Sequence, residues 1–271
     1  MLTIPGHDLR QFDFVGVWMR VVSLVLGLLA ALLGMGGWVA HGLAAPPGLR
    51  LACNDFPPHK IEHPGEDGLA GFDVDIVTEA MQRIGRSVAV SFMPWKRALE
   101  MTERGAYDGL CSCSYMKERA ATLVFSDELG AVSVGLFART EGALAGISSI
   151  ADLKGRKVAT VGGYNLETEL TKAGSDVQPT SSDKHALDML VAGKVDLLYG
   201  YQLTTQHFIA SDPRSRSIAY KEMKRNPYYF CLSRALPSAE ATMQGFNRSL
   251  SDMAKDGSID RILARYHVTF R

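Results

Sequence analysis

One arginine stands where a buried anion-binding group would be expected. Arg119 follows the apolar run 107–114 by a few residues. If that run is a strand, Arg119 lies beyond its carboxyl end, where α/β proteins bind small molecules. A guanidinium there can hold a carboxylate with two parallel hydrogen bonds. The alternative is a surface ion pair with Glu118 or Asp127.

Two serines and two of the four cysteines alternate within the same run. In an extended strand, Ser112 and Ser114 would face one side, and Cys111 and Cys113 the other. The hydroxyls could then bond a ligand amine or hydroxyl. Buried thiols and one disulfide both remain open for the cysteines, because Cys-x-Cys is neither a zinc nor a redox spacing. The full set is Cys53, Cys111, Cys113 and Cys231.

The sequence gives no signal for a metal or a cofactor. The seven histidines are scattered, and His59 and His63 share a proline-broken loop that we expect to be solvated. Gly162-Gly163 alone does not make a phosphate-binding loop. We therefore predict no metal site and no cofactor.

A repeated pattern indicates how these groups are positioned. Ala-Leu-x-Met-x-x-x-Gly-x-x-Asp-x-Leu begins at Ala98 and again at Ala186. Each copy is typical of a helix end, a glycine stop and a short strand. The repeat predicts two α/β lobes of similar build with a binding crevice between them.

Hydrophobic periodicity and turn residues predict the remaining elements. We assign 49–138 plus 232–271 to lobe 1 and 139–231 to lobe 2, with two crossing strands as a hinge. Two consecutive domains are the alternative. The expected strands are 49–53, 87–92, 107–114, 132–138, 157–161, 195–199 and 228–232. The expected helices are 73–84, 94–104, 166–172, 184–192 and 239–255, with packing continued over 259–266.

The charge balance and the N-terminal apolar segment limit the kinds of partner and the cellular compartment that we expect. Lys+Arg and Asp+Glu both total 29, so charge gives no sign of a nucleic-acid partner. Segment 21–40 has no charged residue and precedes small residues ending at Ala44. We expect 1–44 to be a signal peptide, with a retained membrane anchor as the alternative. Either reading places the rest outside the cytoplasmic membrane.

The chain resembles the periplasmic solute-binding proteins of ABC importers, specifically bacterial extracellular solute-binding family 3, the polar amino-acid-binding type. The resemblance runs through most of 49–266 in the family's order. It rests on Asn54-Asp55-Phe56-Pro57-Pro58, Gly71-Phe72-Asp73-Val74-Asp75, Gly105-x-x-Asp108, Lys117-Glu118-Arg119, Phe125-Ser126-Asp127, Asp152-Leu153-Lys154-Gly155-Arg156-Lys157-Val158, Gly193-x-x-Asp196 and Gly257-Ser258-Ile259. Pro94-Trp95-Lys96-Arg97-Ala98-Leu99 resembles a branch with mostly undefined ligands.

The resemblance implies a two-lobed, type II periplasmic-binding-protein-like α/β fold, hinged by crossover strands. It also implies roles for single residues. The ligand arginine falls on Arg119, the hydroxyl donor on Ser114 and a backbone contact on Ser112. Pocket walls fall on Phe56 and Trp95, and the second lobe's anion site on Gly163-Tyr164-Asn165, a glycine turn before a helix.

One departure concerns the ligand's amino group. The resemblance implies an aspartate past the second repeated strand to hold an ammonium, and here that position is Tyr201. Asp55 could substitute from lobe 1. An α-amino acid, an organic acid and a small polar metabolite therefore all stay open.

The resulting hypothesis is a non-enzymatic, monomeric periplasmic protein that closes on a small solute and delivers it to an ABC permease. A dehydratase on the same fold is one alternative, with Asp55, Glu167 or Glu169 as the general acid. A ligand sensor without transport is the other.

Overall fold

The computed structural model describes residues 48–268, which belong to one compact unit. In this part of the chain, eight strands form one mixed sheet in the order β2-β1-β3-β8-β4-β7-β5-β6. The expected α/β class is confirmed. The predicted signal peptide, 1–44, lies outside the described residues. Within 48–268, no helix is long and apolar enough to cross a membrane.

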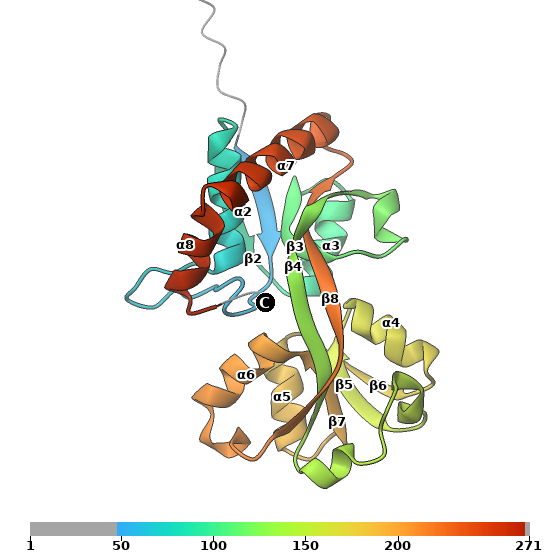
Figure 1. Cartoon of the computed structure of the whole chain (residues 1–271). Helices are drawn as coiled ribbons and strands as arrows, with labels where there is room; N and C mark the ends of the chain where they lie inside the picture. Colours follow the sequence, from blue (N-terminus) through green and yellow to red (C-terminus); the bar gives the residue numbers. More distant parts are fainter. Residues whose placement is uncertain (1–47, 269–271) are drawn as a thin grey trace, which may run out of the picture. The chain divides into compact units, whose positions relative to one another are not determined.

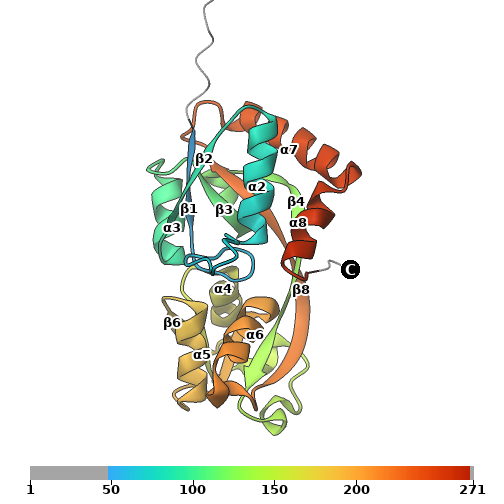
Figure 2. The same ribbon diagram turned by 90° about the vertical axis from the view of Figure 1, so that its left-hand side faces the viewer.

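The upper part of Figure 1, which we call lobe 1, is built on three parallel strands. Helices α2, α7 and α8 cover one face of the sheet, and α3 lies on the other face (Figures 1 and 2). The strands are β1 (Leu49–Cys53), β2 (Val88–Phe92) and β3 (Gly109–Ser114). The helices are α2 (Phe72–Arg83), α3 (Trp95–Glu103), α7 (Ala239–Lys255) and α8 (Ser258–Arg265).

The lower part of Figure 1, which we call lobe 2, repeats this plan. Strand β5 pairs in parallel with β6 and β7, and helices α4, α5 and α6 surround them. The strands are β5 (Lys157–Val161), β6 (Asp176–Thr180) and β7 (Leu197–Tyr201). The helices are α4 (Asn165–Lys172), α5 (Asp183–Val191) and α6 (Gln202–Ser211).

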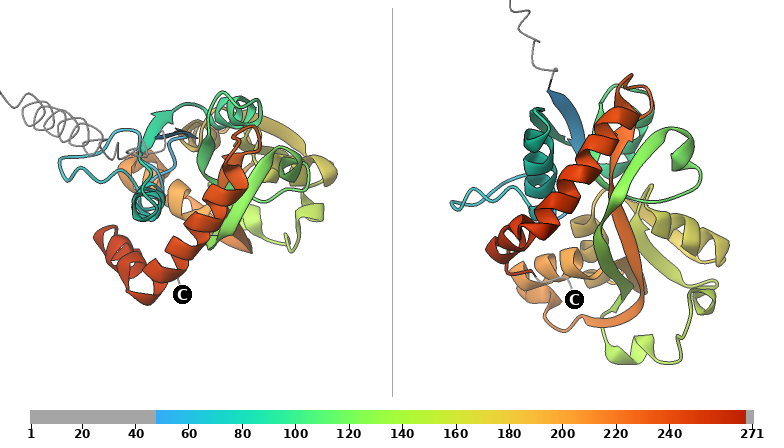
Figure 3. Two further views of the ribbon diagram at one scale, coloured as in Figure 1. Left: turned by 90° about the horizontal axis from the view of Figure 1, so that it is seen from above. Right: turned by 45° about the horizontal axis from the view of Figure 1, so that its top comes forward.

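Two long antiparallel strands run through both lobes. Strand β4 (Leu123–Ala138) pairs with β8 (Ala219–Ser233) from one end to the other. Figure 3 shows the pair as a continuous ribbon connecting the lobes. Because the lobes share these strands, a bend of the pair would move one lobe against the other.

The sequence repeat has the same structural role in each lobe. Gly105 and Gly193 end helices α3 and α5 with φ of 77° and 70°, a left-handed conformation that glycine adopts without steric cost. The repeated aspartates then anchor the neighbouring strand. Asp108 accepts from the backbone N–H of Arg50 at 2.7 Å, and Asp196 from that of Lys157 at 3.1 Å. In each lobe the repeat therefore supplies a glycine that ends a helix and an aspartate that bonds the backbone of the adjacent strand.

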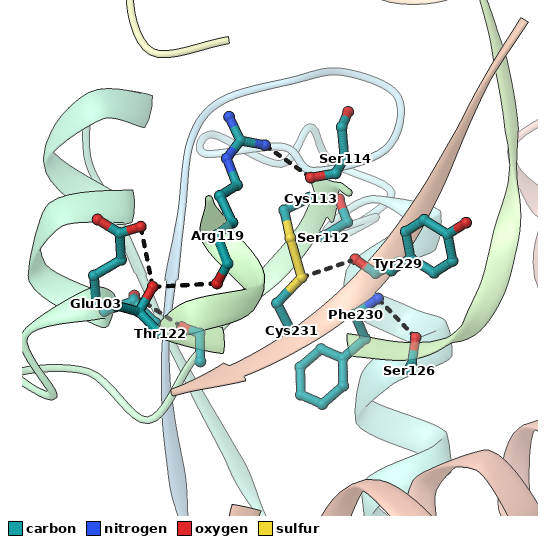
Figure 4. The surroundings of a disulfide bond; sticks show 12 residues. Glu103, Ser112, Cys113, Ser114, Arg119, Thr122, Ser126, Tyr229, Phe230 and Cys231 are labelled. Carbon is teal, nitrogen blue, oxygen red and sulfur yellow. Dashed lines mark hydrogen bonds between the residues drawn. A yellow bond between two sulfur atoms is a disulfide. The ribbon is translucent and has the colours of Figure 1, made fainter. Parts of the chain in front are cut away.

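The described cysteines form two disulfides, Cys53–Cys111 and Cys113–Cys231, so both alternatives, inert thiols and a single bridge, are wrong. The first joins β1 to β3, and the second joins β3 to β8 (Figure 4). The pairing of β3 with β8 has a register shift between Leu110 and Cys113. This bulge breaks the simple alternation expected for the strand.

Several elements differ from the sequence predictions. Strand β6 was not predicted; it contains Pro179 and forms the edge of the sheet, where a missing N–H is tolerated. Helix α6 was also missed, since it buries Thr204 and Thr205 rather than an apolar stripe. Only one end each of β4 and β8 was predicted. The missed part of β8 is largely polar and partly exposed, whereas the missed part of β4 starts with the apolar run Leu123-Val124-Phe125 and is interrupted by exposed Asp127 and Glu128.

Candidate functional site

A partly open cavity lies between lobe 1 and lobe 2, where β3, β7, the start of α4 and the loop after β1 meet. Its volume is about 40 Å³. The residues around it are aromatic or polar, with two basic side chains among them. They are Asn54, Phe56, His59, Lys60, Asp73, Trp95, Ser112, Cys113, Ser114, Arg119, Val132, Tyr164, Asn165, Tyr201 and Tyr228.

Arg119 is buried in this cavity, with 4% of its surface exposed, so the alternative of a surface ion pair is wrong. Its Nη1 donates to the Ser114 carbonyl at 2.8 Å, a bond that Figure 4 shows, and its Nη2 donates to the Gly163 carbonyl at 2.7 Å. The guanidinium also lies 5.3 Å from the ring centroid of Trp95. Burial lowers the pKa of Arg119, yet an arginine stays charged at neutral pH.

Trp95 begins helix α3 and contributes a second bond to the same acceptor. Its Nε1 donates to the Gly163 carbonyl at 2.9 Å, and its ring meets the Tyr164 ring edge-on at 5.8 Å. One carbonyl of lobe 2 therefore accepts from two side chains of lobe 1. These bonds hold the lobes in contact.

The turn before α4 is already occupied at the point expected to receive an anion. Gly163 has φ of 82°, and its N–H donates to Glu167 Oε2 at 2.6 Å. The Tyr164 hydroxyl donates to Asp183 at 2.9 Å and accepts from Asn54 Nδ2 at 3.1 Å. Burial raises the pKa of Asp183 to about 6.

Tyr201 belongs to a neutral hydrogen-bonded cluster. Its hydroxyl donates to Asn165 Oδ1 at 2.7 Å and lies 3.0 Å from Ser114 Oγ, which also accepts from Asn226 Nδ2 at 2.8 Å. Burial raises the pKa of Tyr201, so the phenol stays protonated. No carboxylate faces the ligand from this position.

A second group of charged side chains lies at the other end of the Ser112–Ser114 segment. Lys60 Nζ donates to Ser112 Oγ at 3.1 Å, and Ser112 donates to Asp73 Oδ2 at 2.7 Å. His59 Nδ1 lies 3.3 Å from Asp73 Oδ1. His59 is 1% exposed and packs against Phe72 with ring centroids 4.2 Å apart and the rings tilted, so the expected solvated loop is wrong at this residue.

Most predicted site residues meet at the cavity. Gly163 contributes its carbonyl. Asp55 does not line the cavity; its carboxylate accepts from the backbone of Glu62. The other acids considered as catalysts are also engaged elsewhere, Glu167 with Gly163 and Glu169 with Lys224 at 2.5 Å. The residues that meet are Phe56, Trp95, Ser112, Ser114, Arg119, Tyr164, Asn165 and Tyr201.

Sequence reasoning missed the polar residues that border Phe56 in the chain. Asn54, His59 and Lys60 lie within or next to the Asn-Asp-Phe-Pro-Pro motif, and all three line the cavity. The sequence feature that could have identified them is that they lie within four residues of Phe56, which was expected to form a pocket wall. Within the described residues, no cluster of three metal-ligating side chains occurs.

Comparison with known proteins identifies relatives of this architecture. The model of bacterial extracellular solute-binding proteins, family 3, matches residues 50–269. The chain is 24% identical over 212 residues to the L-cystine-binding protein TcyA of Bacillus subtilis (strain 168), covering 78% of this chain and 77% of that protein. It is 22% identical over 206 residues to a probable amino-acid ABC transporter-binding protein of Haemophilus influenzae, covering 74% and 77%.

Solved structures also share the fold. A histidine kinase sensor domain with similarity to periplasmic binding proteins superposes with a TM-score of 0.72 at 21% identity, covering 82% of this chain and 96% of that one. An ancestral arginine-binding protein bound to arginine gives 0.70 at 23% identity, covering 82% and 99%. The fold is the type II periplasmic-binding-protein-like fold.

Proposed function

Because the chain belongs to the bacterial extracellular solute-binding proteins of family 3, we propose that it captures a small, carboxylate-bearing solute for an ABC permease. The curated relatives are named for L-cystine and for amino acids. The interlobe cavity and its buried arginine support extending that role to this chain.

One observation carries the proposal. Arg119 is buried between the lobes and its Nη2 is satisfied by a single backbone carbonyl of lobe 2, at Gly163. A carboxylate is a stronger acceptor for a guanidinium than a neutral carbonyl, because both partners are then charged. A ligand carboxylate would take the place of the Gly163 carbonyl when the lobes part.

Binding then proceeds by closure. In the open form, lobe 1 presents Arg119, Ser114, Phe56 and Trp95 to the solute. Lobe 2 closes over it with Tyr164, Asn165 and Tyr201. Contacts made only in the closed form shift the equilibrium toward that form, which the permease recognises. This assigns the hinge to the long strands β4 and β8.

The pocket does not require an α-amino group. Tyr201 and its partners are neutral, and Asp55 lies off the cavity. Asp73 does line the cavity, but its carboxylate accepts from Ser112 and faces His59. Asn54 Oδ1 is a buried acceptor with no partner among the described residues, so it can receive one donor from the ligand. A neutral acceptor favours an ammonium less than a carboxylate does. Organic acids are therefore ligands of equal standing with amino acids.

We further propose a periplasmic, monomeric and non-enzymatic protein. Asp55, Glu167 and Glu169, the acids considered for a dehydratase, do not line the cavity, which supports binding over that reaction. The balanced charge of 29 basic and 29 acidic residues favours no nucleic-acid partner. Light scattering of the purified protein checks the monomer.

The test is a calorimetric titration of the full chain with a panel of amino acids and small organic acids. We expect at least one carboxylate-bearing compound to bind, and Arg119→Met to weaken it about 100-fold or more, since two charged hydrogen bonds are lost.

The matched control is Arg97→Met, which removes an exposed arginine from helix α3. It should keep the wild-type affinity. Unchanged affinity in a folded Arg119→Met variant would contradict the proposal, and so would the absence of any ligand in the panel.

A further inference from the structure

Lys60 is a buried ammonium in the binding cavity without an ion pair. It is 4% exposed, and its Nζ donates to Ser112 Oγ and lies 4.9 Å from the centroid of the Phe56 ring. Within residues 48–268 it has no carboxylate partner in salt-bridge range. An ammonium has three N–H donors, so two remain for a ligand.

The acids around Lys60 are engaged by other groups. Asp73 receives the Ser112 hydroxyl on one oxygen and faces His59 Nδ1 with the other. Asp183 receives the Tyr164 hydroxyl. Their fields attract the lysine charge, yet burial is the larger effect and lowers the pKa of Lys60 to about 8. A desolvated cation of this kind gains most from a new anionic partner.

Lys60 and Arg119 reach neighbouring points of the same strand. Lys60 bonds the side chain of Ser112, and Arg119 bonds the carbonyl of Ser114. Two residues along a strand span about 7 Å. Both cations line one cavity, and their bonding partners on β3 lie about as far apart as the two ends of a short-chain diacid.

We infer that the ligand is a short dicarboxylic acid, with one carboxylate held by Arg119 and the other by Lys60. This rests on the proposed function and deepens it. The spacing of Ser112 and Ser114 along β3, about 7 Å in an extended strand, favours a short acid of four or five carbons over a longer solute. His59 Nε2 and Asn54 Oδ1, both buried without partners among the described residues, can bond a hydroxyl or amino substituent on the chain.

The test compares acids that differ only in the second carboxylate. Succinate and butyrate, and glutarate and pentanoate, are titrated calorimetrically into the full chain and into Lys60→Met. We expect each dicarboxylate to bind the wild type about 10- to 100-fold more tightly than its monocarboxylate, the range of one or two charged hydrogen bonds. In Lys60→Met the advantage should fall to about threefold or less.

Lys117→Met is the matched control, because it removes the same charge from an exposed position and should keep the full advantage. Lys60→Gln is the second variant; it retains a donor and should fold even where methionine fails. Equal affinities for the paired acids in wild type, or an undiminished advantage in either folded Lys60 variant, would overturn the inference.

Failure of the proposed function has a different signature. In that case neither these four acids nor any amino acid binds the wild type. If an amino acid binds through Arg119 while the paired acids show no difference, the solute-binding role stands and the dicarboxylate inference alone is wrong.

Discussion

Single side chains decide what the cavity can recognise. Tyr201 places a protonated phenol where related binders are expected to use a carboxylate. Its hydroxyl donates a hydrogen bond to Asn165 Oδ1. Lys60 places a cation at the other end of the cavity. The cavity therefore presents two cations, Lys60 and Arg119, on which the proposal of a dicarboxylate ligand rests.

Asp183 carries a pH dependence that can be measured directly. Its folded-state pKa is raised from 3.8 to about 6, first by burial. A raised pKa means that the folded state binds the proton more tightly than the unfolded chain. This contribution to stability is complete below pH 3.8 and is lost as pH rises through 6.

We expect Asp183→Asn to remove this dependence, since asparagine still accepts from the Tyr164 hydroxyl. From pH 4 to pH 7 the Tm of the variant should rise relative to wild type by at least about 3 °C. Asp188→Asn, a half-exposed aspartate on the same helix, is the control and should run parallel to wild type. If the Tm of Asp183→Asn and the Tm of wild type changed with pH in the same way, the Asp183 carboxyl would not have a raised pKa.

At the scale of elements, β3 does most to assemble the site. Its bulge between Leu110 and Cys113 lets Ser112, Cys113 and Ser114 all line the cavity. Disulfides fix the strand to β1 on one side and to β8 on the other. The strand that presents the ligand groups is thereby locked to a strand that crosses between the lobes.

Removing the β3–β8 bridge with Cys113→Ala/Cys231→Ala should cost about 2–5 kcal/mol of unfolding free energy. The bridge closes a longer loop than Cys53–Cys111, with a sequence separation of 118 against 58. In the loop-entropy model the longer loop contributes about 0.6 kcal/mol more. Denaturant titration of the two double variants measures both values.

The two double variants serve as each other's control, because each keeps the other bridge. If neither variant loses stability relative to the oxidised wild type, the bridges do not stabilise the folded protein. Reduced wild type should be less stable than both.

The sequence anticipated those elements whose local signals agree with their tertiary role. Helix α3 begins directly after Pro94 and stops just before Gly105. Proline at a helix start and glycine after a helix end are both recognisable in the sequence. The position of Arg119 beyond a strand end was also predicted, but spacing alone left a surface ion pair open, and the resemblance supplied the ligand role. Strand β6, which contains Pro179, gave the opposite signal and was missed, since only the finished sheet shows that it lies at an edge.

The burial of Lys60 was not predictable for a related reason. A lysine in a loop rich in proline and histidine is normally solvated. Its burial comes from contacts with Ser112 and Phe56, the first of them 52 positions away in the chain. Local sequence contains no information on such a partner, and the disulfide pairing was hidden for the same reason.

At the scale of the whole molecule, closure is the event that links the site to transport. Arg119, Trp95 and Asn54 of lobe 1 all bond to lobe 2, at Gly163 and Tyr164. A ligand that replaces some of these bonds with stronger ones favours the closed form in proportion to the difference. The position of the ligand carboxylate therefore decides whether Arg119 couples binding to closure.

The most direct measurement is a crystal structure of the protein with the tightest-binding acid of the panel. We predict one carboxylate of the ligand within about 3 Å of the Arg119 guanidinium, the usual length of such a bond, with both lobes touching the ligand. A ligand bound outside the interlobe cavity, or one inside it with Arg119 still bonded only to Ser114 and Gly163, would contradict the account.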